Sequence, residues 1–338
     1  MKMKQYIFIN VICVLFLLFS AACTDDDLKR EGPIGNILKN DCIKRSLGPN
    51  VVGLDLEFAY AMALPPEAGK IISANVEASI AGATGTYMEN RSFYTNGSGI
   101  DVGITVGNPS ITNGAKTEVS FTTDTCAATL RYYYMIPEEA KGREVSFTFT
   151  ASASNGETAS YKMGPYTIAN MDMELDLIVN DGTNCYLSIA DMAVYNETEA
   201  AADASKIDLV YLYRKISGIT FEHAFASPSA DAQYLPDVIL PSGLGNSSLI
   251  RKMYGLRDRH LARLQYGIYV DDSDLQTIDF TGMPNYAINV KNEGGMWVQT
   301  YDGKYHAYIY VNEVNPGSAG STLPANSARI SMKRYTMN

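Results

Sequence analysis

The sequence predicts an all-β protein with two β-sandwich domains, and three observations support this prediction. Apolar and polar residues alternate over many short segments, which is the period of a half-buried strand. Gly, Pro and Asn residues separate these segments, and the 23 tyrosines favour pleated surfaces. The 338 residues are enough for two domains at about 100 to 200 residues each.

The first expected domain, residues 51–169, begins with the clearest strand of the chain. Over residues 54–64, Leu56, Phe58 and Tyr60 are expected on one face and the residues between them on the other. Further strands are expected at residues 72–80, 102–106, 118–122, 129–136 and 145–150 and around Tyr161. Seven or so short strands, with no convincing amphipathic helix, predict an immunoglobulin-like sandwich.

The second expected domain, residues 170–338, starts after Pro165 interrupts the pattern and a new alternating run begins at Met171. Strands are expected at residues 186–195, 207–215, 265–270, 277–280, 296–301, 305–311 and 329–335. Between Ser248 and Leu264 the apolar residues recur at helical spacing, so we expect a short helix inserted beside this second sandwich.

Residues 1–22 have the organisation of a secretion signal. Two lysines precede an apolar run, and the small residues 20–22 lead into Cys23. Counted from Ile7 to Phe19, the apolar run has 13 residues, against roughly 18 or more needed to span a bilayer. We therefore expect cleavage before Cys23 and no permanent transmembrane helix.

Cys23, which follows two alanines, resembles the cysteine of the bacterial lipobox, which becomes the acylated N-terminus of the mature protein. Ser20 departs from that pattern, in which Leu is more common. The aspartates at 25–27 resemble the acidic export signal of surface lipoproteins of the Bacteroidetes. These resemblances imply a lipid anchor at Cys23 in the outer membrane, a flexible tether over residues 23–50 and a body that faces the extracellular side. The alternatives are a plain signal peptide and an acidic tether that is solvated in the periplasm.

The composition excludes some functions and leaves the state of the cysteines open. The formal charge of −10 argues against nucleic-acid binding and against electrostatic attachment to an anionic membrane. Once Cys13 leaves with the signal and Cys23 is acylated, Cys42, Cys126 and Cys185 remain, and an odd number cannot all pair. One disulfide with one thiol is the alternative to three buried thiols that act as small hydrophobic residues, which we favour.

No catalytic machinery is recognisable in the sequence. The chain has three histidines, His223, His260 and His306, and it lacks the HExxH, GxSxG, phosphate-loop and GxGxxG motifs. We therefore expect a protein that is not an enzyme and carries no cofactor. A glycoside hydrolase stays open as an alternative, because its two carboxylates can lie far apart in sequence.

Asp271, Asp272 and Asp274 form an acidic cluster whose oxygens could be calcium ligands. The glycine and the distal Glu of an EF-hand loop are missing. The favoured interpretation is a turn in which these carboxylates are solvated or accept backbone N–H groups, so we predict no metal site.

The strongest binding signal is a predicted hairpin over residues 295–311. Asp302-Gly303 is a preferred two-residue type I′ turn, and it sets a register in which paired positions sum to 605. One face then carries aromatic rings interleaved with hydrogen-bonding groups: Trp297, Gln299, Tyr301, Lys304, His306, Tyr308 and Tyr310. Such a face suits a sugar, whose C–H surface stacks on aromatic rings while polar side chains bind its hydroxyls. The alternative is that this face packs against the first domain or against the expected helix.

The acylated cysteine, the acidic residues after it and the two β-rich domains together resemble the surface lipoproteins encoded with Bacteroidetes glycan-uptake systems, which include accessory proteins of starch utilisation. Only residues 19–27 carry a specific motif, so no ligand site is transferred from that group. The resemblance implies a protein that binds an oligosaccharide or polysaccharide for uptake, beside a porin-like importer and its partner lipoprotein. A structural adhesin or fimbrial component is the other alternative, and it would have a long unpaired edge strand or a donor-strand groove.

Overall fold

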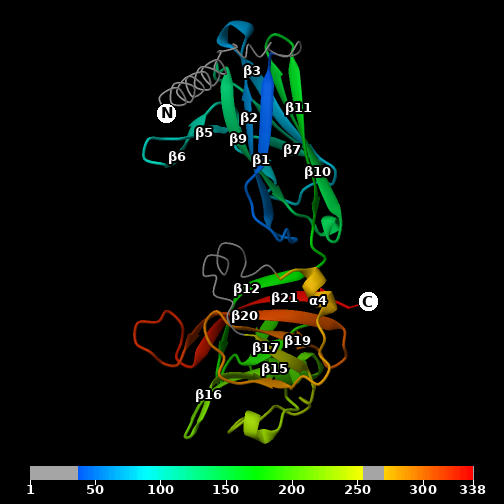
Figure 1. Cartoon of the computed structure of the whole chain (residues 1–338), viewed down its shortest axis with the longest axis vertical. Helices are drawn as coiled ribbons and strands as arrows, with labels where there is room; N and C mark the ends of the chain where they lie inside the picture. Colours follow the sequence, from blue (N-terminus) through cyan, green and yellow to red (C-terminus); the bar gives the residue numbers. More distant parts are fainter. Residues whose placement is uncertain (1–36, 254–269, 338) are drawn as a thin grey trace, which may run out of the picture.

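A computed structural model describes residues 37–253 and 270–337 of the chain. It has two lobes joined near residues 168–171, and each lobe is a sandwich of two antiparallel sheets (Figure 1). The all-β prediction is confirmed. Within the described ranges, no helix is long and apolar enough to cross a membrane.

The first lobe contains two sheets and a projecting hairpin. One sheet has the strand order β1-β2-β9-β4, formed by β1 (Lys39–Lys44), β2 (Asp55–Ala63), β9 (Ala127–Met135) and β4 (Tyr87–Met88). The other has the order β11-β10-β3-β8-β7, formed by β11 (Thr158–Thr167), β10 (Glu144–Ala153), β3 (Ile71–Ala78), β8 (Lys116–Ser120) and β7 (Ile111–Asn113). The hairpin consists of β5 (Arg91–Thr95) and β6 (Asp101–Thr105), and the 3-10 turns η1 (Pro66–Ala68) and η2 (Glu138–Ala140) lie in connections.

The core of the first lobe is aromatic. The ring centroid of Phe58 in β2 lies 4.8 Å from that of Phe147 and 5.4 Å from that of Phe149, both in β10 of the opposite sheet. The alternation predicted for β2 is confirmed, because Leu56, Phe58 and Tyr60 are buried while the residues between them are partly exposed. Aromatic rings that pack between the two sheets in this way bury a large apolar area in the centre of the lobe.

Strand β1 corrects the predicted tether. Residues 39–44 lie within the segment expected to be flexible, yet they form a strand that pairs along β2. The sequence signal is weak here, because Cys42 is the only buried residue of the strand. Tertiary contacts hold it: the carboxylate of Glu157 accepts the backbone N–H groups of Ile37 (3.2 Å) and Leu38 (2.9 Å). The first lobe therefore begins before the predicted boundary at residue 51.

The second lobe also has two five-stranded sheets. One has the order β12-β21-β20-β19-β17, formed by β12 (Asp172–Asn180), β21 (Ser327–Thr336), β20 (Tyr305–Asn315), β19 (Gly295–Gln299) and β17 (Leu249–Met253). The other has the order β14-β13-β15-β16-β18, formed by β14 (Ala193–Tyr195), β13 (Tyr186–Ser188), β15 (Leu209–Ile216), β16 (Ile219–Ala226) and β18 (Tyr286–Ala287). Helices α2 (Glu197–Ala202) and α4 (Asp272–Thr277) and the 3-10 turns η3 (Ala204–Lys206) and η4 (Ala232–Tyr234) complete it.

Two local predictions for this lobe need correction, and one strand was missed. Residues 249–253 of the expected inserted helix form strand β17, and residues 254–264 lie outside the described part of the chain. The strand expected at residues 277–280 is wrong, because Thr277 ends helix α4 and a loop follows. Strand β16 was not predicted, and within it Glu222 has a positive φ of 49°. The strand expected at residues 265–270 falls almost wholly outside the described ranges.

The two lobes meet at helix α4, which lies at the end of the second lobe nearest the first (Figure 1). The backbone N–H of Asn170, in the connection, donates to the carboxylate of Asp272 over 2.8 Å. Val51 of the first lobe belongs to the same buried cluster as Phe280 and Trp297 of the second. The hairpin that carries the predicted binding face therefore lies at the junction.

Candidate functional site

The hairpin of β19 and β20 has the predicted register, since Trp297 pairs with Tyr308 and their positions sum to 605. The predicted type I′ turn is wrong. That turn needs a positive φ at both Asp302 and Gly303, and only Gly303 has one, at 70°. The register is right all the same, because the alternation of buried residues along both strands sets it as well.

The aromatic face of this hairpin is covered. The exposed fraction is 8% for Trp297, 1% for Tyr308 and 2% for Tyr310. These rings form one buried cluster with Leu275 of helix α4 and with Phe280 in the loop after it. The exposed sugar-binding face that the sequence suggested is therefore wrong. The face is packed, as in the alternative, with Val51 of the first lobe in the same cluster, but the helix that covers it is α4 and not the one expected between residues 248 and 264.

The polar residues in the middle of this face bond to each other and to helix α4. His306 is 4% exposed, and its Nδ1 lies 2.7 Å from the carbonyl oxygen of Leu275. A carbonyl can only accept, so Nδ1 carries the hydrogen and Nε2 accepts from the amide nitrogen of Gln299 at 2.9 Å. His306 is thus a packing residue with satisfied nitrogens. His260 lies outside the described residues.

Two residues of the predicted face remain on the surface, at the tip of the hairpin. Tyr301 is 52% exposed, and Lys304 is exposed with its Nζ 3.5 Å from a carboxylate oxygen of Asp302. They are separated from the buried rings and do not form a binding face with them.

The acidic cluster caps a helix. The carboxylate of Asp271 accepts the backbone N–H groups of Ser273 (2.9 Å) and Asp274 (3.3 Å), and the carboxylate of Asp274 accepts that of Asp271 (3.1 Å). These bonds form a capping box at the start of α4, and the carboxylate of Asp272 accepts the backbone N–H of Asn170. Across the described ranges, no group of three or more His, Cys, Asp or Glu side chains could hold a metal ion.

Cys42, Cys126 and Cys185 are all free thiols. Cys42 and Cys185 are buried, as favoured from the sequence, whereas Cys126 is partly exposed. Burial raises the pKa of Cys42 to about 12 and that of Cys185 to about 11, so neither forms a thiolate at neutral pH.

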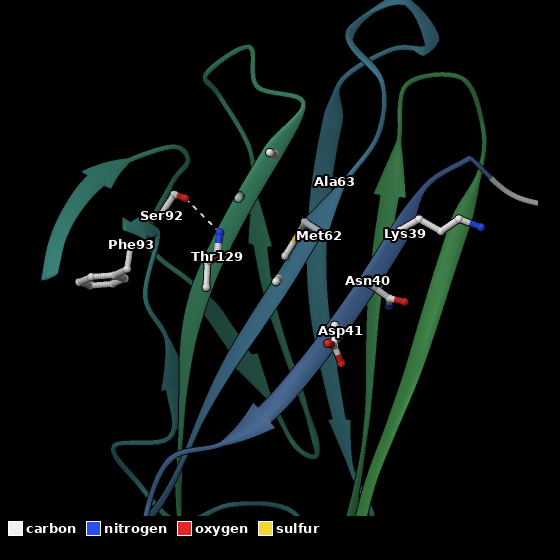
Figure 2. A pocket seen from close by; sticks show the side chains of 11 residues that line it. Lys39, Asn40, Asp41, Met62, Ala63, Ser92, Phe93 and Thr129 are labelled. Carbon is white, nitrogen blue, oxygen red and sulfur yellow. Dashed lines mark hydrogen bonds between the residues drawn. The ribbon is translucent and has the colours of Figure 1, made fainter. Parts of the chain in front are cut away.

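A surface groove of about 490 Å³ lies on the first lobe, between the β5–β6 hairpin and the sheet that contains β1, β2 and β9. We call it the β5–β6 groove. Figure 2 shows Phe93 at one side, Asn40 and Asp41 at the other, and Met62 and Thr129 between them. The lining residues are Lys39, Asn40, Asp41, Ala61, Met62, Ala63, Ser92, Phe93, Ala127, Ala128 and Thr129.

Small side chains create this hollow. Ala61, Ala63 and Ala127 lie on the outer face of β2 and β9, where the alternation places them away from the core. The hairpin stands off the sheet and is tied to it by the hydroxyl of Ser92, which accepts the backbone N–H of Thr129 over 3.0 Å (Figure 2). Larger residues at the alanine positions would fill the space.

Phe93 is held in place from two directions. It pairs across the hairpin with Gly103, where an added Cβ would lie only 2.9 Å from the Cε1 atom of the ring. The guanidinium carbon of Arg131 lies 4.1 Å from the ring centroid, a cation–π contact. The ring is therefore fixed while it remains partly exposed to the groove.

Strand β1 supplies polar groups opposite Phe93. The amide nitrogen of Asn40 donates to the Tyr60 hydroxyl and to the Ala159 carbonyl oxygen, at 2.9 Å each, which fixes the side chain. Asp41 accepts the backbone N–H of Cys42 (2.8 Å) through one oxygen. The groove thus combines an aromatic ring with carboxylate, amide and hydroxyl groups, which can stack on and hydrogen-bond to an uncharged polar ligand.

Sequence reasoning missed this site because it rests on two elements that were not predicted, β1 and β5. One signal was present: the turn residues Asn96 to Gly99 lie between two short β-prone segments, the pattern of a hairpin. Nothing in the sequence places that hairpin beside β1.

The fold and the groove define an all-β protein of two sandwich lobes with a surface site on the first, and comparison with known proteins identifies its family. Residues 35–168 match the family described as Domain of unknown function (DUF4466), and residues 169–337 match the Domain of unknown function (DUF8576). The two matches meet where the chain passes from the first lobe to the second.

The chain belongs to the DUF4466 family. It is 47% identical to a DUF4466 family protein of Parabacteroides merdae, a member of the Bacteroidetes, whose crystal structure it matches with a TM-score of 0.80 over 89% of this chain and 99% of that one. No curated protein matches. The pilin GBS80 of Streptococcus agalactiae is 12% identical with a TM-score of 0.27, over 54% of this chain and 74% of that one. A likeness as slight as that carries no functional argument.

Proposed function

We propose that this protein is a non-catalytic surface lipoprotein that binds an oligosaccharide or polysaccharide in the β5–β6 groove. The observation that carries the proposal is the position of the fixed, partly exposed ring of Phe93 across the groove from Asn40 and Asp41. The volume, about 490 Å³, falls in the usual range of roughly 300 to 1,000 Å³ for small-molecule sites.

The chemistry of the groove suits a sugar. The C–H face of a pyranose ring packs on an aromatic side chain, and its hydroxyls both donate and accept hydrogen bonds. The carboxylate of Asp41, which the side chain of Tyr161 also contacts, and the hydroxyl of Thr129 supply acceptors, and Lys39 is the cation of the lining. Because Phe93 and Asn40 are already fixed, binding costs little side-chain entropy.

The location of the protein in the cell is the second part of the proposal. Cys23 is acylated and holds the chain to the outer membrane, and the aspartates at 25–27 direct it to the extracellular side. The family membership supports this, because the Parabacteroides relative comes from the group of bacteria in which that acidic signal occurs. There the protein would deliver glycans to a porin-like importer and its partner lipoprotein.

Glycan binding is tested by retention on a panel of polysaccharides in affinity gels, followed by calorimetry with the best ligand. Phe93→Ala is expected to weaken binding at least tenfold with an unchanged melting temperature. Tyr94→Ala is the matched control, because Tyr94 is the next residue, 52% exposed on the other face of the hairpin. Absence of retention of the wild type on every polysaccharide, or unchanged binding by Phe93→Ala, would refute the proposal.

The proposed location is tested separately: mass spectrometry measures acylation, and antibody labelling of intact cells measures surface exposure. Cys23→Ala is expected to abolish acylation. Replacing the three aspartates at 25–27 with alanine is expected to keep acylation and lose surface labelling. An acylated Cys23→Ala protein, or full labelling without the aspartates, contradicts the respective half of the proposal.

A further inference from the structure

A second pocket, of about 540 Å³, lies on the second lobe between β16, residues 290–292 and the end of β20. We call it the His223 pocket. Its lining combines apolar residues such as Val290 and Val314 with the polar and charged residues Lys215, Glu222, His223, Lys291 and Asn292. It shares no residue with the buried aromatic cluster or with the β5–β6 groove.

Backbone hydrogen bonds hold the walls of this pocket together. The N–H of Val290 donates to the carbonyl oxygen of His223 over 2.8 Å, which lays residues 290–292 along β16. The side-chain oxygen of Asn292 accepts the backbone N–H of Val314 over 2.7 Å, which ties the same segment to β20. The pocket is therefore built by ordered elements from both sheets.

His223 leaves one buried nitrogen atom unsatisfied. The residue is 2% exposed, and its Nδ1 lies 2.6 Å from the hydroxyl of Tyr211. Within the described part of the chain, Nε2 has no hydrogen-bond partner. Buried polar atoms are almost always paired, because an unpaired one loses its bond to water. When Tyr211 donates to Nδ1, Nε2 carries the hydrogen and can donate it to a ligand oxygen.

Two exposed ammonium groups, those of Lys215 and Lys291, lie at the same pocket. Neither forms an ion pair among the residues that the structure describes. The chain as a whole carries a formal charge of −10, so its surface generally repels anions. Because the pocket has two lysines without an ion pair in the described ranges and one carboxylate, that of Glu222, it is locally positive and can attract an anion.

We infer that the His223 pocket binds a uronic acid residue of an acidic polysaccharide. Lys215 and Lys291 receive its carboxylate, the Nε2–H group of His223 donates to a ring or hydroxyl oxygen, and Glu222 accepts from sugar hydroxyls. Burial lowers the pKa of His223 to about 4, so its ring is neutral at physiological pH and keeps one donor and one acceptor. The inference rests on the proposed glycan-binding function and names a ligand class for the second lobe.

The test uses the full acylated chain in detergent and measures binding by calorimetry. The ligands are oligosaccharides of glucuronate, galacturonate and mannuronate, each with its neutral counterpart, and a sulfated galactan oligosaccharide. We expect at least one uronate to bind tenfold or more tightly than its neutral counterpart. The double variant Lys215→Gln, Lys291→Gln is expected to lose this preference, and His223→Phe to weaken uronate binding about tenfold.

Lys304→Gln is the matched control, because Lys304 is an exposed lysine of the same lobe at the tip of another hairpin. Uronate binding that survives the double lysine variant, binding of the sulfated ligand alone, or equal binding of neutral and acidic forms overturns the inference. Phe93→Ala separates the two sites. If Phe93→Ala binds uronates as the wild type does, and no glycan binds this variant more weakly, the proposed glycan site in the β5–β6 groove is refuted while the inference for the His223 pocket is kept.

Discussion

The Nδ1 atom of His306 lies 2.7 Å from the backbone carbonyl oxygen of Leu275, and this contact joins the β19–β20 hairpin to the helix that covers it. The same helix buries Trp297, whose ring centroid lies 4.8 Å from that of Tyr308 in an edge-on arrangement. The only tryptophan of the chain is therefore part of the junction between the lobes, and its substitution should affect folding.

Trp297→Ala should lower the free energy of unfolding by about 3 to 5 kcal/mol, the usual cost of truncating a large buried aromatic residue. Denaturant unfolding followed by circular dichroism measures it. Tyr301→Ala, at an exposed position of the same hairpin, should change stability by no more than about 0.5 kcal/mol. Equal stabilities of the two variants would mean that the aromatic cluster contributes nothing.

The sequence predictions that succeeded are those in which apolar residues recur at every second position. The run through Leu56, Phe58 and Tyr60 forms strand β2, and the hairpin register was right because alternation along both strands sets it, although the predicted turn was wrong. Burial of Trp297 could not be predicted in the same way. The helix that covers it begins 25 residues earlier in the chain, at Asp272, and the pattern gives no sign that the two meet.

The β5–β6 groove shows the same limit. Asn40 lies on a strand whose sequence is mostly polar, and Phe93 lies on a short hairpin outside both sheets. Their positions on the two sides of the groove follow from how the hairpin folds back over β9, where Ser92 contacts Thr129, 37 residues further along the chain. Local propensity contains no information about such a contact.

Asp208 should make stability depend on pH in the mildly acidic range. Its carboxyl is buried, accepts from the backbone N–H of Ile189 (2.9 Å) and the hydroxyl of Ser248 (2.9 Å), and burial raises its pKa to about 6. The unfolded value is about 3.9, so between pH 4 and 6 the native state binds more protons than the unfolded state. The free energy of unfolding should therefore fall by about 3 kcal/mol as the pH rises through this window.

Asp208→Asn should remove that fall, and urea unfolding at pH 4, 5, 6 and 7 measures it. Asp203→Asn, at an exposed position of the same lobe, serves as the control and should keep the wild-type profile. A wild-type profile that is retained in Asp208→Asn would assign the pH dependence to another group.

Lys333 should make the free energy of unfolding rise with pH in the alkaline range, the opposite of the effect of Asp208. It is 3% exposed, its Nζ donates to the carbonyl oxygen of Val270 (2.9 Å), and burial lowers its pKa to about 8 while Asp271 and Asp274 raise it in part. The unfolded value is about 10.4, so above pH 8 the unfolded state binds more protons and the free energy of unfolding rises with pH. The full effect is about 3 kcal/mol.

The measurement is the difference in unfolding free energy between the wild type and Lys333→Met from pH 7.5 to 9.5, in which the contribution of the buried tyrosines cancels. The wild type should gain on the variant as the pH rises. A difference that does not change with pH contradicts a neutralised lysine. Lys304→Met, on the surface, should show no such trend.

Glu157 should control whether strand β1 stays on the sandwich. Its two carboxylate oxygens accept from the backbone N–H groups of Ile37 and Leu38, and the bond from Leu38 is the main cause that lowers the pKa of Glu157. A depressed folded pKa means that this anchoring is present above the ordinary Glu range and is lost as the pH falls through the folded value. Glu157→Ala removes it at every pH.

Hydrogen exchange at neutral pH should therefore be faster for residues 37–44 in Glu157→Ala, while strand β10 keeps its protection. Glu144→Ala, at the exposed start of β10, is the matched control and should leave β1 unchanged. Because β1 carries Asn40 and Asp41, Glu157→Ala should also weaken glycan binding in the β5–β6 groove without touching the ligand. Unchanged exchange in β1 would show that pairing with β2 alone holds the strand and would remove Glu157 from the account of the groove.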